Sequence, residues 1–357
     1  MKVRPQLHGL TVARGLAAWM VVLFHIRSGM PWLPQSFVVV AAKGYLAVDF
    51  FFLLSGFVIY LSAHGIFERH GLAALPDFLR RRVARIYPLY AAMLALTVGF
   101  AALLTLTGRN ADGYPWRELP LHIVLLQNWS FTDELSWNHP AWSISTELAA
   151  YLLFPLIMVA MPIRRLSSPK LVIGIVVLLA TMAAWLRTAG LTELGQQIHR
   201  FGLVRCLFEF SAGCLLCALW LRTGKNWLRF AAPSAVIVAA AALWASDSTH
   251  ELWAFPAMAA SLIFLIADLS AWQRPPAPPV RALIYLGELS YATYLSHCML
   301  FIWFKIVMVN DATDIPPMLI ALYCMATLAA SVLLHHFVEK PGRRWVSGRR
   351  ASLPAHA

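Results

Sequence analysis

Residues 11–26 read TVARGLAAWMVVLFHI, an apolar run that contains two polar side chains, Arg14 and His25. A charged side chain in the hydrocarbon core of a membrane costs roughly 2.5–3.5 kcal/mol, so it normally faces the protein interior and serves a function. Eleven residues at 100° each exceed three helical turns by about 20°, which puts both side chains on nearly one face, ~16 Å apart along the axis. The run therefore predicts a transmembrane helix with a cation near one membrane surface and an imidazole near the other.

The composition of the whole chain extends this prediction. Of its 357 residues, 60% are hydrophobic and 13% are charged, whereas soluble domains carry about 25% charged residues. A spanning helix needs ~20 apolar residues, and we predict an all-α, polytopic membrane protein with about ten transmembrane helices around a central cavity. The predicted spans are 10–29, 45–63, 86–107, 141–161, 171–187, 200–221, 231–246, 252–268, 282–304 and 317–338.

The remaining segments suggest a single domain. Residues 118–131 are predicted to form a loop or a re-entrant segment, and the other connections are short. We therefore expect one transmembrane domain over residues 1–345 and a basic, disordered cytoplasmic tail over residues 346–357.

The basic residues indicate the orientation of the chain. With the N-terminus in the cytoplasm, 20 of the 29 Lys and Arg fall on the inner side and 7 on the outer side. This distribution follows the positive-inside rule and predicts that both ends are cytoplasmic. The net charge of +12 thus reflects topology, with at most a weak contribution to contacts with anionic lipid. It does not indicate a nucleic-acid partner.

All five cysteines lie in apolar stretches, which favours packing roles. Cys214 and Cys217 have a CxxC spacing, but a zinc site needs four ligands and usually a second such pair. We therefore predict no metal site.

The predicted topology sorts the polar side chains of the spans into two sets by depth. The outer set is His25, Asp49, Glu147, Arg205, Glu209 and His297, and the inner set is Arg14, Arg82, Arg85 and Glu288. A carboxylate can orient an imidazole and raise its basicity, so that it removes a proton from a hydroxyl. The planar guanidinium of arginine matches phosphate. This pattern predicts a phosphorylated donor that enters from the cytoplasm and a hydroxyl acceptor near the outer surface.

Six segments also resemble, in order, those of a known family. They are RGLAAWMVVLFH (14–25), GYLAVDFFFLLSGF (44–57), FLRRRVARIYPLY (78–90), HPAWSISTELAAYLLFP (139–155), LGELSYATYLSH (286–297) and HHFVEKPGRR (335–344). Together they resemble the membrane-bound acyltransferase-3 family, which includes O-acetyltransferases of lipopolysaccharide, exopolysaccharide and Nod-factor sugars. The resemblance implies a multi-pass protein of the bacterial plasma (inner) membrane. It would transfer an acyl group, usually acetyl, from cytoplasmic acyl-CoA to a hydroxyl of a cell-envelope or exported glycan.

The resemblance also suggests roles for individual residues. It implies that His25 is the key catalytic residue, as a base or as an acyl carrier, while Glu147 and Asp49 both remain candidates to orient it. The residues expected to bind the donor, acetyl-CoA or another acyl-CoA, are Arg14, Arg82 and Arg85. Those expected to contact the acceptor are Trp142, Ser145, Tyr291, Tyr294 and His297.

Two other functions remain open at this point. A transporter or exporter of a lipid-linked sugar or small anion could use the same polar side chains as a permeation path. No inverted repeat or matching pair of Gly/Pro-broken spans is evident in the sequence to support it. The third possibility is an acyltransferase that acts on a small molecule such as a macrolide. The oligomeric state is not predicted.

Overall fold

The structure is a computed structural model that describes residues 7–224, 226–270 and 277–348. Within these ranges the secondary structure is helical, with no strand. Ten α-helices have 18 residues or more. They are α1 (His8–Ile26), α3 (Ala47–His70), α4 (Leu75–Leu106), α6 (Trp142–Ala160), α7 (Ser168–Thr188), α8 (Ile198–Arg222), α9 (Leu228–Ser246), α10 (Glu251–Ser270), α11 (Pro278–Met308) and α12 (Pro317–Leu334).

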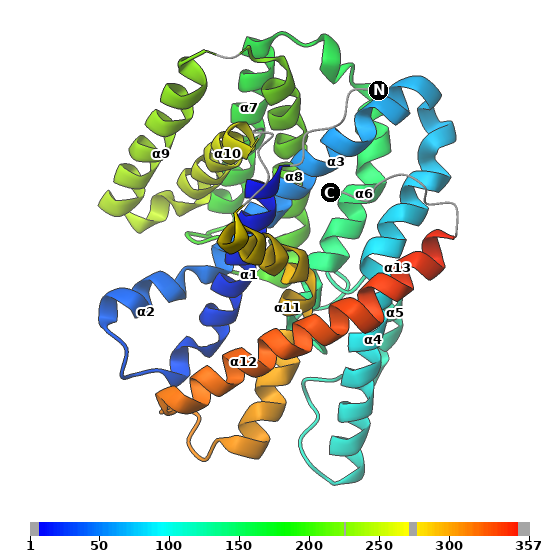
Figure 1. Cartoon of the computed structure of the whole chain (residues 1–357), viewed down its shortest axis with the longest axis vertical. Coiled ribbons are helices and arrows are strands. Elements are labelled where there is room, and N and C mark those ends of the chain that lie inside the picture. Colours follow the sequence, from blue (N-terminus) through cyan, green and yellow to red (C-terminus); the bar gives the residue numbers. More distant parts are fainter. Residues whose placement is uncertain (1–6, 225, 271–276, 349–357) are drawn as a thin grey trace.

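These helices confirm the predicted all-α, polytopic membrane fold. The described residues form nine continuous helical stretches that are long and apolar enough to cross a membrane, and the longest, Gln35–Leu106, holds both α3 and α4. Short helices complete the chain: α2 (Gln35–Ala42), α5 (Leu119–Ile123) and α13 (Lys340–Ser347). Figure 1 shows α7 to α10 grouped on one side of the molecule, α4 and α6 on the other, and α12 crossing obliquely in front.

Several helices extend beyond their predicted bounds, and two of these extensions bear on the site. The third span is predicted to start at residue 86, but α4 begins at Leu75, so the basic run before Pro88 is helical. Beyond α12, a π-helical turn (His335–Glu339) joins α13, which continues the helix to Ser347. The first residues of the expected tail are therefore helical, while residues 349–357 lie outside the described part of the chain.

Glycines set the closest helix crossings. A Cβ added at Gly56 of α3 would overlap the carbonyl oxygen of Phe210 in α8, and one at Gly213 of α8 would overlap that of Leu53 in α3. Similarly, a Cβ at Gly287 of α11 would overlap a carbonyl of α1. Small residues let backbones approach in membranes, where dispersion contacts drive helix association. These crossings place α1 against α11 and α3 against α8.

Residues 118–131 form a folded loop without a transmembrane helix. After α5, Leu125 and Ser130 adopt positive φ angles of 61° and 63°. Asn128 is fully buried. Its N–H bonds Ser145 Oγ at 3.2 Å, and its side-chain amide bonds the carbonyl of Ile198 at 3.3 Å. Irregular backbone at membrane depth is tolerated where the protein supplies such partners.

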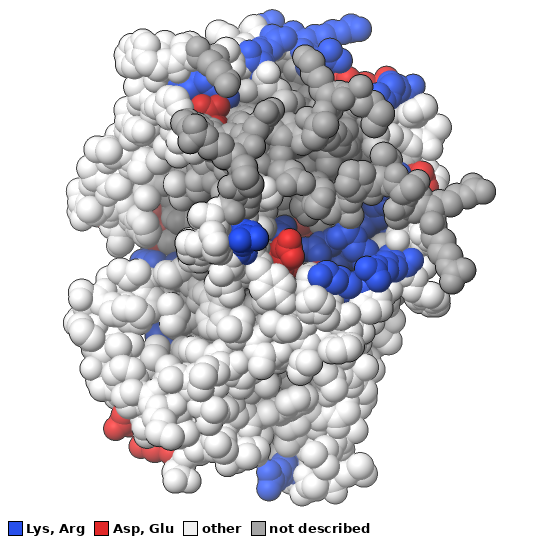
Figure 2. Space-filling view, in the orientation of Figure 1, with Lys and Arg blue, Asp and Glu red and all other residues white. Residues whose placement is uncertain are grey.

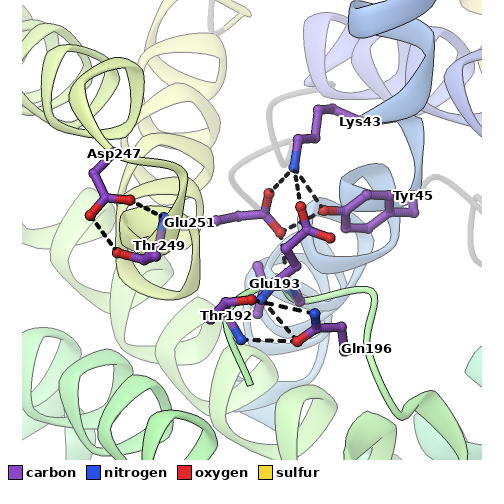
Figure 3. Close-up of polar contacts among 9 residues, drawn as sticks. Lys43, Tyr45, Thr192, Glu193, Gln196, Asp247, Thr249 and Glu251 are labelled. Atoms are coloured by element: carbon purple, nitrogen blue, oxygen red, sulfur yellow. Dashed lines mark hydrogen bonds and ion pairs between the residues drawn. The ribbon is translucent and has the colours of Figure 1, made fainter. Parts of the chain in front are cut away.

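An ionic cluster joins several segments near the start of α3 (Figure 3). The Nζ of Lys43 lies 2.7 Å from Glu251 and 2.9 Å from Glu193. Tyr45 donates its hydroxyl to Glu251 at 2.6 Å, and the N–H of Leu194 bonds the same carboxylate at 2.9 Å. The cluster joins the start of α3, the connection between α7 and α8, and the start of α10.

Beside this cluster, Asp247 caps the turn between α9 and α10. It accepts hydrogen bonds from the N–H and the hydroxyl of Thr249, each at 2.8 Å. These two bonds hold the pKa of the exposed Asp247 carboxyl below its usual range.

Candidate active site

His25 lies near the last turn of α1 and contacts a second histidine. Its Nδ1 is 2.9 Å from the carbonyl oxygen of Val21 and 3.2 Å from Nε2 of His297 in α11. A third histidine, His139, lies beside them with its ring centroid 5.9 Å from that of His25. His25 is half-buried and His139 is exposed, so this histidine group is open on one side.

The hydrogen bonds define which nitrogens carry protons. Nδ1 of His297 lies 2.7 Å from the carbonyl oxygen of Tyr294, which can only accept, so this nitrogen is the protonated one in neutral His297. Nε2 of His297 is therefore an acceptor, and Nδ1 of His25 must donate to it and to Val21. In a neutral imidazole only one nitrogen carries a proton. The lone pair of His25 is consequently on Nε2, as a general base requires.

Arg14 faces the same neighbouring helix as His25, as the helical spacing predicts. Its guanidinium donates to the carbonyl oxygen of Gly287 in α11 through Nη2 at 3.0 Å and Nε at 3.3 Å. Gly287 and His297 are ten residues apart in α11, and Arg14 and His25 are eleven apart in α1. The two packed helices thus carry a cation at one end and the histidine pair at the other.

Asp49, one of the two acids expected beside His25, is bound to an arginine instead. Arg205 binds both of its oxygens, at 2.6 and 2.7 Å from Nη2, and both side chains are fully buried. Glu209, one turn further along α8, is also fully buried and lies beside Asp49 and Arg205. Asp49 therefore lies in a buried ionic group between α3 and α8.

Glu147, the other expected acid, lies nearer the arginines. Its Oε1 accepts hydrogen bonds from Ser55 and Tyr151, both at 2.6 Å. It also lies close enough to Arg14, Arg82 and Arg85 for electrostatic interaction. Within the described ranges, neither Glu147 nor Asp49 hydrogen-bonds His25; the position expected for a carboxylate is taken by His297 and a backbone carbonyl.

The predicted donor-binding arginines come together with a fourth. Arg85 forms an ion pair with Glu339 at the π-helical turn, and Glu339 also accepts from Nδ1 of His335 at 2.9 Å. Arg343 of α13 is close enough to Arg82 and Arg85 for their charges to interact. We call Arg14, Arg82, Arg85 and Arg343 the arginine cluster. Figure 2 shows basic side chains gathered over the region where α13 lies in Figure 1.

Arg82 is a member of the arginine cluster with free capacity for a ligand. Its Nε is buried and has no hydrogen-bond partner among the described residues. Its guanidinium carbon lies 5.9 Å from the ring centroids of both Phe78 and Tyr151. Arg85, in contrast, has Glu339 as its partner, and its side chain is 20% exposed.

The residues expected to contact the acceptor mostly have internal partners. The hydroxyl of Ser145 donates to the carbonyl of Leu125 at 2.8 Å, and that of Tyr291 donates to the carbonyl of Ile86 at 2.6 Å. The hydroxyl of Tyr294 lies 2.8 Å from Ser143 Oγ. Trp142 does border a small pocket, which it shares with residues of α5 and of the loop before α6. Those residues include His122, Glu134, Ser136 and His139.

Sequence reasoning missed three residues at these two ends: His139, Cys298 and Arg343. From the sequence, Arg343 is one of the basic residues on the predicted inner side, and Cys298 is one of five cysteines in apolar stretches. The sequence offers a partial signal for Cys298, which follows His297 directly. No spacing relates His139 to His25, because they meet only through the packing of separate segments.

Fold and site together define a class: a multi-pass membrane protein with an arginine cluster and a histidine group at the two ends of a packed helix pair. The family profile described as an acyltransferase domain, acyltransferase 3, matches residues 7–336. The chain therefore belongs to the acyltransferase-3 family, as its motifs predicted.

Curated relatives agree with this assignment. The chain is 30% identical to acyltransferase MdmB of Streptomyces mycarofaciens, over 97% of this chain and 94% of the relative. It is 24% identical to the peptidoglycan O-acetyltransferase OatA of Listeria monocytogenes, over 61% of this chain and 34% of that protein. A putative O-acetyltransferase of Staphylococcus aureus is 23% identical over 96% of this chain and 58% of its own length. No solved structure matches.

Proposed function

We propose that this acyltransferase moves an acyl group, most often acetyl, from cytoplasmic acyl-CoA to a hydroxyl of a cell-envelope or exported glycan. It would do so in the bacterial inner membrane, with the arginine cluster on the cytoplasmic side. The observation that carries the proposal is the pair of hydrogen-bond contacts made by Nδ1 of His25. Its Nδ1 is committed to Val21 and His297, which leaves Nε2 as a base on a half-buried side chain.

The donor would bind at the arginine cluster. Arg82, with its unpartnered Nε, and Arg343 offer guanidinium groups to the phosphates of CoA, and Arg14 lies further along the same path. Charge-assisted hydrogen bonds to phosphate are about twice as strong as neutral ones. The extended pantetheine arm would then bridge the ~16 Å along α1 that separates Arg14 from His25.

The chemistry follows from these positions. Nε2 of His25 takes the proton of the acceptor hydroxyl, whose oxygen forms the ester bond with the acyl carbon. CoA leaves as the thiol. His297 holds His25 in the required tautomer, a role that the sequence led us to expect of Glu147 or Asp49. A positioned general base contributes about 10²- to 10⁴-fold to the rate.

The test is transfer from radiolabelled acetyl-CoA by the full-length protein in lipid nanodiscs, with isolated envelope glycan as acceptor. His25→Ala should lower the rate by at least ~100-fold. The matched control is His64→Ala, because Nδ1 of His64 also bonds the carbonyl four residues earlier, at 2.7 Å, but without a second histidine. Full activity of His25→Ala would refute the proposed role.

A second arm of the same assay tests the donor site. Arg82→Ala should raise the KM for acyl-CoA by ~10- to 100-fold, the equivalent of about 1.5–3 kcal/mol for one charge-assisted bond. The control is Arg81→Ala. The Arg81 side chain is exposed, and its Nη2 lies 3.8 Å from a carboxylate oxygen of Asp77. An unchanged KM in Arg82→Ala would place the donor elsewhere. Substrate flux without any CoA release would favour a transporter, and transfer only to a small molecule would replace the glycan as acceptor.

A further inference from the structure

Cys298 differs from the other four cysteines in its surroundings. Cys206, Cys214 and Cys217 are fully buried in α8, and Cys324 of α12 packs against an apolar cluster formed with α1 and α11. Cys298 is half-buried in α11, and its sulfur lies 3.3 Å from Nε2 of His297. All five cysteines are in the described ranges, and Cys298 is the one whose sulfur contacts an imidazole nitrogen.

The imidazole beside Cys298 is arranged to act as its base. Nδ1 of His297 donates to the carbonyl of Tyr294 at 2.7 Å, so Nε2 is the accepting nitrogen, and the thiol and Nδ1 of His25 share its lone pair. His25 also donates to this nitrogen, but Nδ1 of His25 has a second acceptor at 2.9 Å in Val21. His297 can therefore take the thiol proton without leaving His25 unpaired. A nucleophile, a base within reach and a third group that orients the base form the pattern of covalent catalysis.

Cys298 and His297 both lie within reach of His25, the proposed base for the acceptor hydroxyl. One potential ligand or nucleophile atom each from His25, His297 and Cys298 falls within 4.8 Å of the others. The thiol is therefore close to the base proposed for the acceptor hydroxyl.

We propose that Cys298 is a nucleophile that carries the acyl group between donor and acceptor. This inference rests on the proposed acyl transfer and adds a covalent route to it. The protein would then react in two half-reactions, and CoA could leave before the acceptor is acylated.

In the first half-reaction the thiol proton moves to Nε2 of His297. The Cys298 thiolate attacks the carbonyl carbon of the acyl-CoA thioester, and a new carbon–sulfur bond forms. The bond to the sulfur of CoA breaks, and the CoA thiolate takes the proton from His297. One thioester replaces another, so no oxidant, reductant or energy source is needed.

In the second half-reaction Nε2 of His25 takes the proton of the acceptor hydroxyl, and the acceptor oxygen attacks the acyl-cysteine. The carbon–sulfur bond breaks as the ester forms. Nδ1 of His25 passes its proton to Nε2 of His297, 3.2 Å away, and His297 returns a proton to the thiolate. Cys298, His297 and His25 end in their starting protonation states, except that His25 has changed tautomer. It returns to the original tautomer by exchange with water at its open side.

The alternative use of the three side chains is a metal site. An imidazole–imidazole–thiolate set suits zinc, and His297 has the backbone partner that metal ligands usually have. Against this, Nδ1 of His25 points at the Val21 carbonyl and carries a proton, so it could bind a metal only after losing that bond. The geometry therefore favours the nucleophile, and metal content becomes an outcome of the test.

The experiment incubates the full-length protein with radiolabelled acetyl-CoA and no acceptor, followed by an acid quench. We expect about one acyl group per chain, released by neutral hydroxylamine as a thioester is, and located by mass spectrometry on the peptide with Cys298. Cys298→Ala should lose the label and at least ~100-fold of the transfer rate, the scale of a removed catalytic group. Cys298→Ser, close in size, should retain the melting temperature while losing transfer. The control is Cys324→Ala, the other half-buried cysteine.

His25→Ala separates this inference from the proposed function. If both are right, this variant still forms acyl-Cys298 but fails to pass the acyl group to the acceptor. If Cys298→Ala transfers at the wild-type rate, the covalent route is wrong while the acyltransferase stands. The covalent route would also be wrong if the wild-type protein contained one zinc ion per chain and Cys298→Ala contained none. If the wild type transfers nothing and releases no CoA, both proposals fail together.

Discussion

Among single residues, the acids of the spans have different partners from those their depth suggested. Asp49 is held by Arg205, and Glu147 by Ser55 and Tyr151. A buried carboxylate without a partner is costly, so each acid is expected to be neutralised or hydrogen-bonded. The nearest donors satisfy this requirement, and they belong to helices that only the folded bundle brings together.

The ion pair of Asp49 and Arg205 allows a test of its structural role. Asp49→Leu should destabilise the protein by about 3–5 kcal/mol, because it leaves the Arg205 charge buried and unpaired. The double variant Asp49→Leu/Arg205→Leu should recover much of this loss. Thermal unfolding of the purified protein measures both.

The matched control for this pair is an exposed one. Arg164 and Glu68 lie 3.0 Å apart, with the arginine side chain 77% exposed, and Arg164→Ala should change stability by only about 0–1 kcal/mol. If Asp49→Leu were as stable as the wild type but inactive, Asp49 would instead belong to the catalytic machinery.

At the scale of helices, close backbone contact holds the site in place. The Gly56 and Gly213 crossing joins α3 to α8, and the Gly287 crossing joins α11 to α1. The second of these crossings determines whether Arg14 and His25 reach their partners in α11. The π-helical turn between α12 and α13 similarly presents Glu339 to Arg85. Such turns occur frequently at functional sites.

The α3 to α8 crossing predicts a position-specific effect of an added methyl group. Gly56→Ala should destabilise the protein by about 1–3 kcal/mol or more, because backbone atoms of α8 cannot move aside as a side chain could. The control is Gly65→Ala in the same helix, where a Cβ would meet nothing within 4 Å. That change should be neutral or stabilise by about 0.5–1 kcal/mol. Equal melting temperatures for the two variants would contradict this account of the crossing.

For the whole molecule, the open prediction is its orientation in the membrane. The arginine cluster would face the cytoplasm and the histidine group the outside.

The connection between α11 and α12 contains Asp311, whose carboxylate accepts from the hydroxyl of Thr313 at 2.6 Å and from its N–H at 2.8 Å. These bonds hold the pKa of this exposed Asp311 below its usual range.

Reporter fusions test the orientation directly. Alkaline phosphatase inserted at residue 311 should be active, since that enzyme folds only outside the cytoplasm, and a fluorescent protein at the C-terminus should be fluorescent. The reverse pattern would show that the protein has the opposite orientation in the membrane. It would then place the arginine cluster away from cytoplasmic acyl-CoA and remove the donor site from the proposed function.

The amino-acid sequence by itself determined that the chain is helical and crosses the membrane repeatedly, because apolar runs of sufficient length have no other stable state in a bilayer. It also placed Arg14 and His25 on one face of one helix, since that depends only on helical geometry. Only the tertiary structure decided which side chains meet. The pairing of His25 with His297, of Asp49 with Arg205 and of Arg85 with Glu339 depends on how each helix is rotated and crossed against its neighbours. Whether two side chains form a hydrogen bond depends on a few tenths of an ångström in their separation. Sequence spacing fixes only the position of a residue along its own helix.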